Sequence, residues 1–174
     1  MKSFLLKLVV KKQSYKKLFL KMGLIAGLIF LSGALFFSRF TFGYDGQLYK
    51  CIPGYSIYLI DKKDRALTKG KTYAFKAKGT SPLIKEGTTL VKFLRGEPGD
   101  KIEIRPDTRI YVNDEMVGGG LRYAENLGKK PEDFIGAAQI AGYWFMGTSI
   151  YSFDSRYWGT AEKDQVLGRA YPVL

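Results

Sequence analysis

The hydrophobic pattern of the chain sets one long apolar segment apart from the rest. Residues 22–37, MGLIAGLIFLSGALFF, contain no charged side chain. An α-helix rises about 1.5 Å per residue. A segment that starts at Leu18 and lets the Lys21 side chain extend towards the interface therefore reaches roughly 30 Å, the thickness of a hydrocarbon core. We predict a transmembrane anchor at residues 18–37.

The charges around this segment predict its orientation. No acidic residue occurs before Asp45, and seven lysines precede or begin the apolar run: Lys2, Lys7, Lys11, Lys12, Lys16, Lys17 and Lys21. Segments rich in lysine and arginine stay on the cytoplasmic side of a membrane. We therefore expect residues 1–17 to be a basic cytoplasmic tail of a single-pass protein in a bacterial inner membrane, with the remainder in the periplasm.

Two other interpretations of the apolar segment stay open but are less favoured. A cleaved signal peptide needs small residues after the apolar run, where this chain has Phe36, Phe37 and Arg39. A lipoprotein needs its cysteine directly after that run, whereas Cys51 lies well beyond it and follows Lys50. An uncleaved anchor is therefore the preferred interpretation.

After a predicted linker at residues 38–46, the pattern changes to that of short strands. Apolar and polar residues alternate, with many β-branched and aromatic residues, at 56–61, 71–79, 89–96, 101–117, 142–147 and 167–174. The sequence EPGD at 97–100 is a turn signature, and Asn113 and Asp114 form a hairpin tip. Residues 120–138 form a long loop with one helical turn at PEDFIG. The predicted fold class is mainly β, with one antiparallel domain at residues 47–174.

The composition excludes several kinds of site. The formal net charge is +12, but without the seven N-terminal lysines the chain has 21 basic and 16 acidic residues, so the charge does not require a nucleic-acid partner. One cysteine allows neither an intramolecular disulfide nor a zinc site built from several thiolates. Histidine, the usual base of a cysteine or serine nucleophile, is absent. No metal or cofactor is expected.

Three motifs in order resemble those of the signal peptidase I family. They are LVKFLRGEPGDKIEI at 90–104, YWFMGTSIYSFDSRYWG at 143–159 and the closing strand LGRAYPVL at 167–174. In that family a serine just outside the membrane anchor is the nucleophile, and a lysine is its base. The nucleophile motif is Ser-Met-x-Pro, or Ser-x-Pro in the conjugative-transfer, TraF-like branch. This chain has Cys51-Ile52-Pro53 in its place, with cysteine replacing serine. The resemblance covers about residues 47–174.

The resemblance implies a role for each matching residue. Cys51 is assigned as the nucleophile and Lys92 as the general base, while Ile52 and Pro53 are assigned to substrate binding. The supporting residues are Ser152, which would bind the lysine, and Asp154 with Arg156, an ion pair. These three residues are spaced two apart, so their side chains lie on one face if the segment is extended.

The chemistry of a cysteine–lysine dyad is reasonable without histidine. A lysine base must be neutral, which apolar surroundings favour, and Lys92 lies between Val91 and Phe93. A thiol also loses its proton more easily than a hydroxyl. Without the motif, the simpler interpretation of Lys92 is a polar, outward-facing residue of a half-buried strand.

Two details depart from the family pattern or compete with this assignment. The family often supplies an oxyanion-hole hydroxyl two residues before the nucleophile, and that position is Tyr49 here; the backbone N–H of Cys51 can serve instead. Ser56 is a second hydroxyl close by, but no proline follows it in the register of the motif.

Two classes of function remain. The first is a membrane-anchored peptidase or transpeptidase that matures a pilin or another signal-bearing precursor through an acyl-enzyme. Conventional leader-peptide removal and pilin maturation compete within this class. The second is a non-catalytic assembly subunit of a secretion or conjugation apparatus that kept the fold. In either class the expected partners are a protein and the membrane.

Overall fold

The computed structural model describes residues 15–174 and contains two compact units, Met1–Ser38 and Arg39–Leu174. The first unit consists, within the described residues, of helix α1, which runs from Tyr15 to Arg39 and ends one residue inside the second unit. This helix is long and apolar enough to cross a membrane. The predicted anchor at 18–37 lies inside it, whereas residues 1–14 of the predicted tail lie outside the described part of the chain.

The two serines of α1 are compatible with an apolar environment. Ser32 Oγ donates to the carbonyl oxygen of Leu28, and Ser38 Oγ donates to that of Leu35, each over 2.7 Å. A hydroxyl that bonds to its own helix backbone needs no water. Helix α1 can therefore enter a hydrocarbon layer without an unsatisfied hydroxyl.

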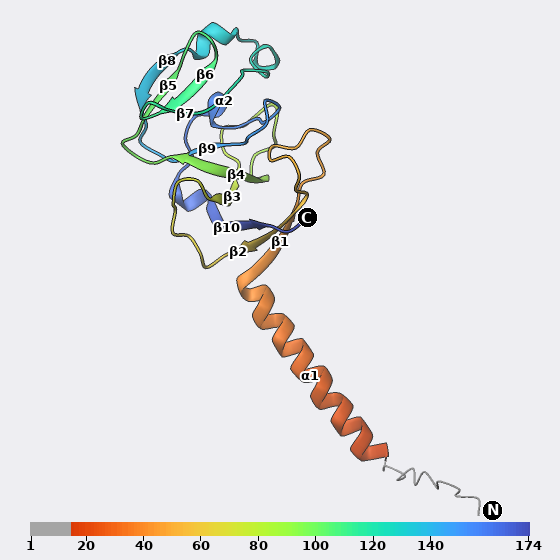
Figure 1. The fold of residues 1–174 in the computed structure, drawn as a ribbon. Coiled ribbons are helices and arrows are strands. Elements are labelled where there is room, and N and C mark those ends of the chain that lie inside the picture. The colour runs from red at the N-terminus through yellow and green to blue at the C-terminus, as the bar shows by residue number, and fades with distance from the viewer. Residues whose placement is uncertain (1–14) are drawn as a thin grey trace, which may run out of the picture. The chain divides into compact units, whose positions relative to one another are not determined.

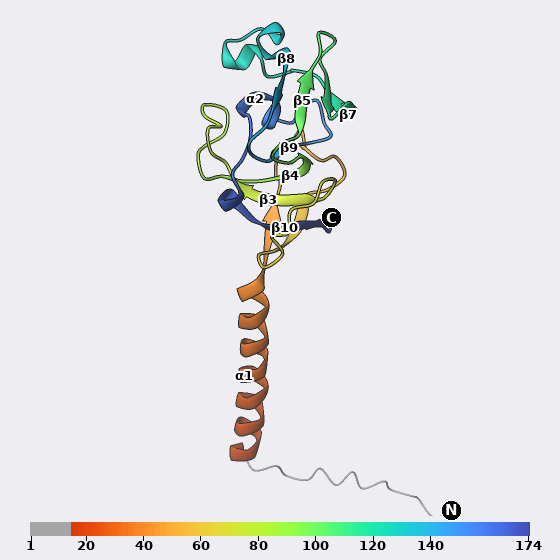
Figure 2. The same ribbon diagram turned by 90° about the vertical axis from the view of Figure 1, so that its left-hand side faces the viewer.

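The second unit contains two antiparallel sheets (Figures 1 and 2). The larger sheet has the strand order β1 (Phe40–Tyr44), β2 (Ile57–Asp61), β10 (Val166–Pro172), β3 (Thr72–Lys76), β4 (Thr89–Gly96) and β9 (Trp144–Met146). The smaller sheet has the order β7 (Glu115–Gly119), β6 (Arg109–Val112), β5 (Lys101–Ile104) and β8 (Gly136–Gln139). The fold is mainly antiparallel β, as the sequence predicts.

Short helical segments connect the strands. They are helix α2 (Ser155–Trp158) and the 3₁₀ helices η1 (Glu125–Leu127), η2 (Pro131–Phe134) and η3 (Lys163–Gln165). Helix η2 is the helical turn predicted in the long loop. At the predicted hairpin tip between β6 and β7, Asn113 and Asp114 have φ angles of 46° and 69°, values that asparagine and aspartate tolerate better than most residues.

Two strands occur where the sequence predicts none. Strand β1 lies inside the predicted linker at 38–46 and pairs with β2 from Phe40 opposite Asp61 to Tyr44 opposite Ile57. Strand β8 begins inside the predicted long loop, ends one residue beyond it and pairs with β5. Strand β1 adjoins the apolar run, which hides its alternation. Strand β8 consists of exposed and mostly small residues. These strands form through pairing with a neighbour more than through side-chain burial.

Strand β4 presents an unusual residue to the interior. Its buried positions are Leu90, Lys92, Leu94 and Gly96, so the lysine takes a place in a row of core residues. Leu90 and Leu94 belong to a core cluster with Tyr73, Phe75 and Phe145. Because side chains of a strand alternate between faces, Lys92 must point in the same direction as the two leucines.

Candidate active site

Cys51 lies in the loop between β1 and β2 and is buried, with 8% of its surface exposed. Its carbonyl oxygen accepts hydrogen bonds from the backbone N–H groups of Thr148, over 3.0 Å, and Ser149, over 3.2 Å. These bonds hold the Cys51 loop against the turn that follows β9. The two segments are almost 100 residues apart in the sequence, and strand β9 brings that turn beside β4.

Lys92 extends from β4 towards the same turn. Its Nζ atom donates a 2.9 Å hydrogen bond to Ser152 Oγ, and both side chains are almost fully buried, with exposures of 1% and 0%. Lys92 and Cys51 line one cavity of about 200 Å³, together with residues of the β1–β2 loop and the first half of β4. The structure thus brings together the cysteine, the lysine and the serine that the sequence selects.

Gly147 makes this close packing possible. A Cβ atom at this position would lie 2.5 Å from the carbonyl oxygen of Cys51 and would also collide with Ser152 Oγ. Contacts this short cannot form without movement of the backbone. Any larger residue at position 147 would therefore separate the Cys51 loop from the Ser152 turn.

Asp154 and Arg156 form a buried ion pair below the site. Arg156 Nε and Nη2 approach the two carboxylate oxygens at 2.7 Å each, and Gly147 N–H donates to Asp154 Oδ2 over 2.9 Å. The segment is not extended, so the condition for three side chains to share one strand face is not met. Asp154 is the N-cap of α2 and accepts from the Arg156 backbone N–H, which turns both side chains towards each other.

The Arg156 guanidinium also joins two loops. It donates to the carbonyl oxygens of Gly119 and Gly120 at the end of β7, and to those of Ser149 and Ser152 beside the site. Burial lowers the pKa of Arg156, but the hydrogen bonds and charge of Asp154 outweigh this and leave the pKa raised. The glycine-rich segment 118–120 is thus anchored by a permanent cation.

Comparison with known proteins identifies the family. The model of the family described as "Signal peptidase, peptidase S26" matches residues 9–174. This chain belongs to the S26 signal peptidase family. It is therefore a peptidase, with protein substrates.

The other comparisons add less. A crystal structure of a signal peptidase I from Enterococcus faecalis V583 is similar at 21% sequence identity, with a TM-score of 0.40, and the match covers 62% of this chain and 98% of that one. Among the curated proteins, no match was found.

One polar contact in this S26 peptidase is not apparent from its sequence motifs. Cys51 Sγ lies 3.8 Å from Gln47 Oε1, within the range for a weak S–H···O hydrogen bond. The Gln47 backbone N–H donates to Asp45 Oδ1, which holds the loop in a tight turn. Gln47 is four residues before the cysteine in an irregular loop, so no periodic pattern predicts that its amide returns to the thiol.

The remaining predicted residues lie around the site in different ways. Tyr49, at the family's oxyanion position, stacks on Tyr151 with ring centroids 4.5 Å apart. Ser56 Oγ accepts a hydrogen bond from Lys50 Nζ and does not line the cavity of Cys51 and Lys92. Ile52 is buried against a separate cavity.

Pro53 is exposed, and it lines neither the cavity that contains Ile52 nor the one that contains Cys51 and Lys92. The structure therefore gathers the nucleophile, base and supporting residues of the sequence assignment. It does not place the Ile52 and Pro53 side chains in the cavity that Cys51 and Lys92 line.

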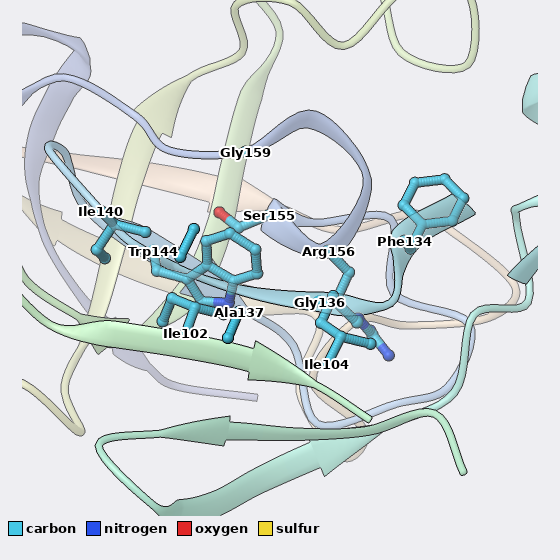
Figure 3. Close-up of a pocket in the computed structure, with 11 residues that line it drawn as sticks. Ile102, Ile104, Phe134, Gly136, Ala137, Ile140, Trp144, Ser155, Arg156 and Gly159 are labelled. Carbon is cyan, nitrogen blue, oxygen red and sulfur yellow. The ribbon is translucent and has the colours of Figure 1, made fainter. Parts of the chain in front are cut away.

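A second cavity, of about 330 Å³, lies among strands β5, β8 and β9 and helix α2 (Figure 3). Ile102, Ile104 and Trp144 surround it, and it contains neither the cysteine nor the candidate base. Within residues 15–174, no three histidine, cysteine, aspartate or glutamate side chains gather to hold a metal ion. Among these cavities, the candidate chemistry therefore belongs to the one between Cys51 and Lys92.

Proposed function

We propose that this S26 peptidase matures a membrane-associated precursor with a Cys51–Lys92 dyad. The observation that carries the proposal is the buried Lys92 amine, which is bonded to Ser152 and shares a cavity with the only thiol of the chain. The ion pairs formed by the described residues do not include Lys92. The amine is therefore held by a hydroxyl, with no carboxylate beside it, in a cavity that it shares with the thiol.

The reaction follows from these positions. The Lys92 amine takes the proton from Cys51 Sγ, and the thiolate attacks the substrate carbonyl carbon. The backbone N–H of Cys51 is available to the developing oxyanion. When the peptide C–N bond breaks, the Lys92 ammonium returns its proton to the leaving amine, and a thioester to Cys51 remains.

Ser152 and Arg156 act through position in this mechanism. The Ser152 hydroxyl accepts from the Lys92 amine, which fixes the direction of the amine lone pair and its hydrogens. Arg156 holds the Ser152 carbonyl and the Asp154 carboxylate, so that the turn keeps its shape. An oriented base is effective because the proton transfer then needs little reorganisation.

The second half-reaction suggests the class of substrate. A thioester reacts with an amine more readily, relative to water, than an oxoester does. An amine held close to the acyl-enzyme at high effective concentration would therefore compete with hydrolysis. We infer that the substrate is a pilin-type precursor of a conjugative system, whose own N-terminus attacks the thioester and closes a ring.

The membrane helix supports a substrate of this kind. Helix α1 is long and apolar enough to cross a membrane, and basic residues precede it. We propose that the N-terminus is cytoplasmic and the second unit periplasmic, so that enzyme and precursor meet near the bilayer surface. Protease added to spheroplasts should then digest the second unit, whereas its survival would contradict this orientation.

Intact mass spectrometry of a co-expressed propilin tests the proposed reaction. Wild-type enzyme should release the segment that follows the scissile bond and give a mature chain lighter than the linear product by one water molecule. Linear product alone, from a substrate with a free N-terminal amine, would leave a conventional leader peptidase with a cysteine nucleophile. If no precursor in a panel of propilins and signal-bearing precursors were processed, the result would favour the alternative function, a non-catalytic assembly subunit.

A further inference from the structure

A cavity lined by aromatic residues also borders Cys51. It has a volume of about 360 Å³ and shares Gln47, Cys51 and Ile84 with the cavity of Lys92, but Lys92 does not line it. Its walls come from the Cys51 loop, the segment before β4 and the two loops joined by Arg156. The large apolar or aromatic residues in these walls are Leu48, Tyr49, Leu83, Ile84, Tyr123, Tyr151 and Phe153.

One wall of this aromatic cavity is rigid. Tyr123 Oη donates a 3.0 Å hydrogen bond to the carbonyl oxygen of Tyr151, and the Tyr123 backbone N–H donates to Tyr157 Oη. Phe153 stacks on Tyr157 with centroids 5.2 Å apart and meets Tyr123 edge to face at 5.8 Å. The hydroxyl of Tyr123 is satisfied, so its ring can act as an apolar surface.

The opposite rim is exposed to water. Leu48, Tyr49 and Leu83 have exposures of 88%, 57% and 37%. Exposed apolar side chains around a pre-formed aromatic wall are costly unless a ligand covers them for part of the time. The arrangement resembles a binding site whose floor is fixed and whose rim closes over the occupant.

The position of the cavity indicates what occupies it. A group bound there lies next to the sulfur that attacks the scissile carbonyl, so the occupant belongs to the polypeptide substrate itself. No charged side chain lines this cavity. The Arg122 guanidinium lies 5.5 Å from the centroid of the Tyr151 ring, within reach of a cation–π contact. The lining therefore suits a flat, uncharged side chain.

We propose that this cavity binds an aromatic side chain of the substrate next to the scissile bond. This inference rests on the proposed function, because it assumes that Cys51 is the nucleophile. It adds a substrate preference that the Cys51–Lys92 dyad alone would not produce. Stacking against Tyr49, Tyr123 or Phe153 would supply the affinity.

The single cysteine allows a test that needs no turnover. The full-length protein in lipid nanodiscs is alkylated with iodoacetamide or with its N-phenyl derivative, iodoacetanilide. Each rate is divided by the rate for N-acetylcysteine under the same conditions. We expect the phenyl reagent to be favoured by about fivefold or more in the wild type, because its ring is buried beside the sulfur.

Two rim variants and two controls locate the bound ring. Tyr49→Ala and Leu83→Ala each remove exposed rim surface and should reduce the preference towards one. Tyr55→Ala is the matched control, because Tyr55 is 40% exposed and lines a different cavity. Tyr44→Ala is the second control, because Tyr44 lines the cavity of Lys92 and not the aromatic cavity. The reagent partitions into lipid equally for all variants, so this effect cancels when their rates are compared.

The inference is overturned if the wild type shows no preference, or if only Tyr44→Ala changes it. These results are separate from a failure of the proposed function, since alkylation does not require a competent base. A phenyl preference in an otherwise inactive protein would keep the cavity and reject the catalytic dyad. Equal rates in a protein that processes its precursor would keep the dyad and reject the cavity.

Discussion

The amine of Lys92 is hydrogen-bonded to the hydroxyl of Ser152 across 60 residues of sequence, and both groups are removed from water. Strand β4 supplies the lysine from the face that carries Leu90 and Leu94, and the turn after β9 supplies the serine. The pair costs stability, because an amine is placed where an apolar side chain would pack. Such a cost is expected where a buried group serves chemistry.

Replacing Ser152 with alanine should slow processing without abolishing it. The Lys92 amine would remain, but it would lose its hydrogen-bond partner and its fixed direction. We expect turnover to fall roughly tenfold to hundredfold, as for the loss of one hydrogen bond to a buried polar group. Steady-state cleavage of a precursor peptide measures this, with the exposed Ser81→Ala as the matched control. Unchanged turnover in Ser152→Ala would remove the serine from the mechanism.

Gly147→Ala should damage the site through packing alone. The new methyl group would lie 2.5 Å from the Cys51 carbonyl oxygen and would push the Ser152 hydroxyl away. We expect at least about a tenfold loss of turnover and roughly 1–3 kcal/mol less free energy of unfolding, as for an overpacked core. Gly27→Ala is the control, since nothing lies within 4 Å of a Cβ atom there. If both variants behave as the wild type, the close approach at Gly147 is not required.

Asp100 should make the second unit sensitive to acid. Burial by itself raises the pKa of Asp100. Hydrogen bonds from the Glu97 backbone N–H and from the Asn113 and Lys69 side chains lower this pKa by more, so that it lies below its ordinary value of 3.8. A lowered pKa in the folded state stabilises the fold above the unfolded value, and this is lost as the pH falls through the folded value.

The variant Asp100→Asn tests this contribution. We expect it to cost about 1–2 kcal/mol of unfolding free energy near neutral pH and progressively less below about pH 4. Chemical unfolding followed by the fluorescence of Trp144 and Trp158 at several pH values measures the difference. The exposed Asp164→Asn should show little change at any pH. A cost for Asp100→Asn that does not vary with pH would argue against the charged form.

Cys51→Ser should separate the two fates of the acyl-enzyme. A hydroxyl is harder to deprotonate than a thiol, so the rate should fall while some activity remains. The oxoester should also favour water over an amine more than the thioester does. The ratio of cyclic to linear product, read by intact mass, should therefore shift towards the linear form. An unchanged ratio would show that the nucleophile does not select the acceptor.

The strands that alternate clearly are predictable from the sequence, and the strands that depend on a partner are not. Strand β4 matches its prediction at both ends, 89–96, because apolar residues alternate and EPGD closes it. Strand β1 is hidden by the apolar run before it. Its pairing with β2 and the Arg39–Asp61 ion pair of 2.6 Å are long-range relationships that no local pattern encodes.

The candidate site shows the same division. Motifs select Cys51, Lys92 and Ser152, but alternation alone does not settle whether Lys92 faces inward, since a lysine between Val91 and Phe93 fits an outward position equally well. The inward direction follows from the burial of Leu90 on the same face.

Gln47 and the aromatic cavity could not be selected from the sequence. Their residues come from loops, whose side-chain directions depend on contacts with distant segments. Those contacts include the bonds from Arg156 to the carbonyl oxygens of Gly119 and Ser149.

Processing by Cys51→Ala, Lys92→Ala and the double variant is the most direct test of the Cys51–Lys92 dyad. Each protein is co-expressed with the precursor, and the mass of the precursor is followed by intact mass spectrometry. The fluorescence of the buried Trp144 verifies that each variant is folded. We expect each single variant to lose processing and the double variant to be no worse, because the two residues act as one unit. Substantial processing by folded Lys92→Ala or Cys51→Ala would contradict the dyad.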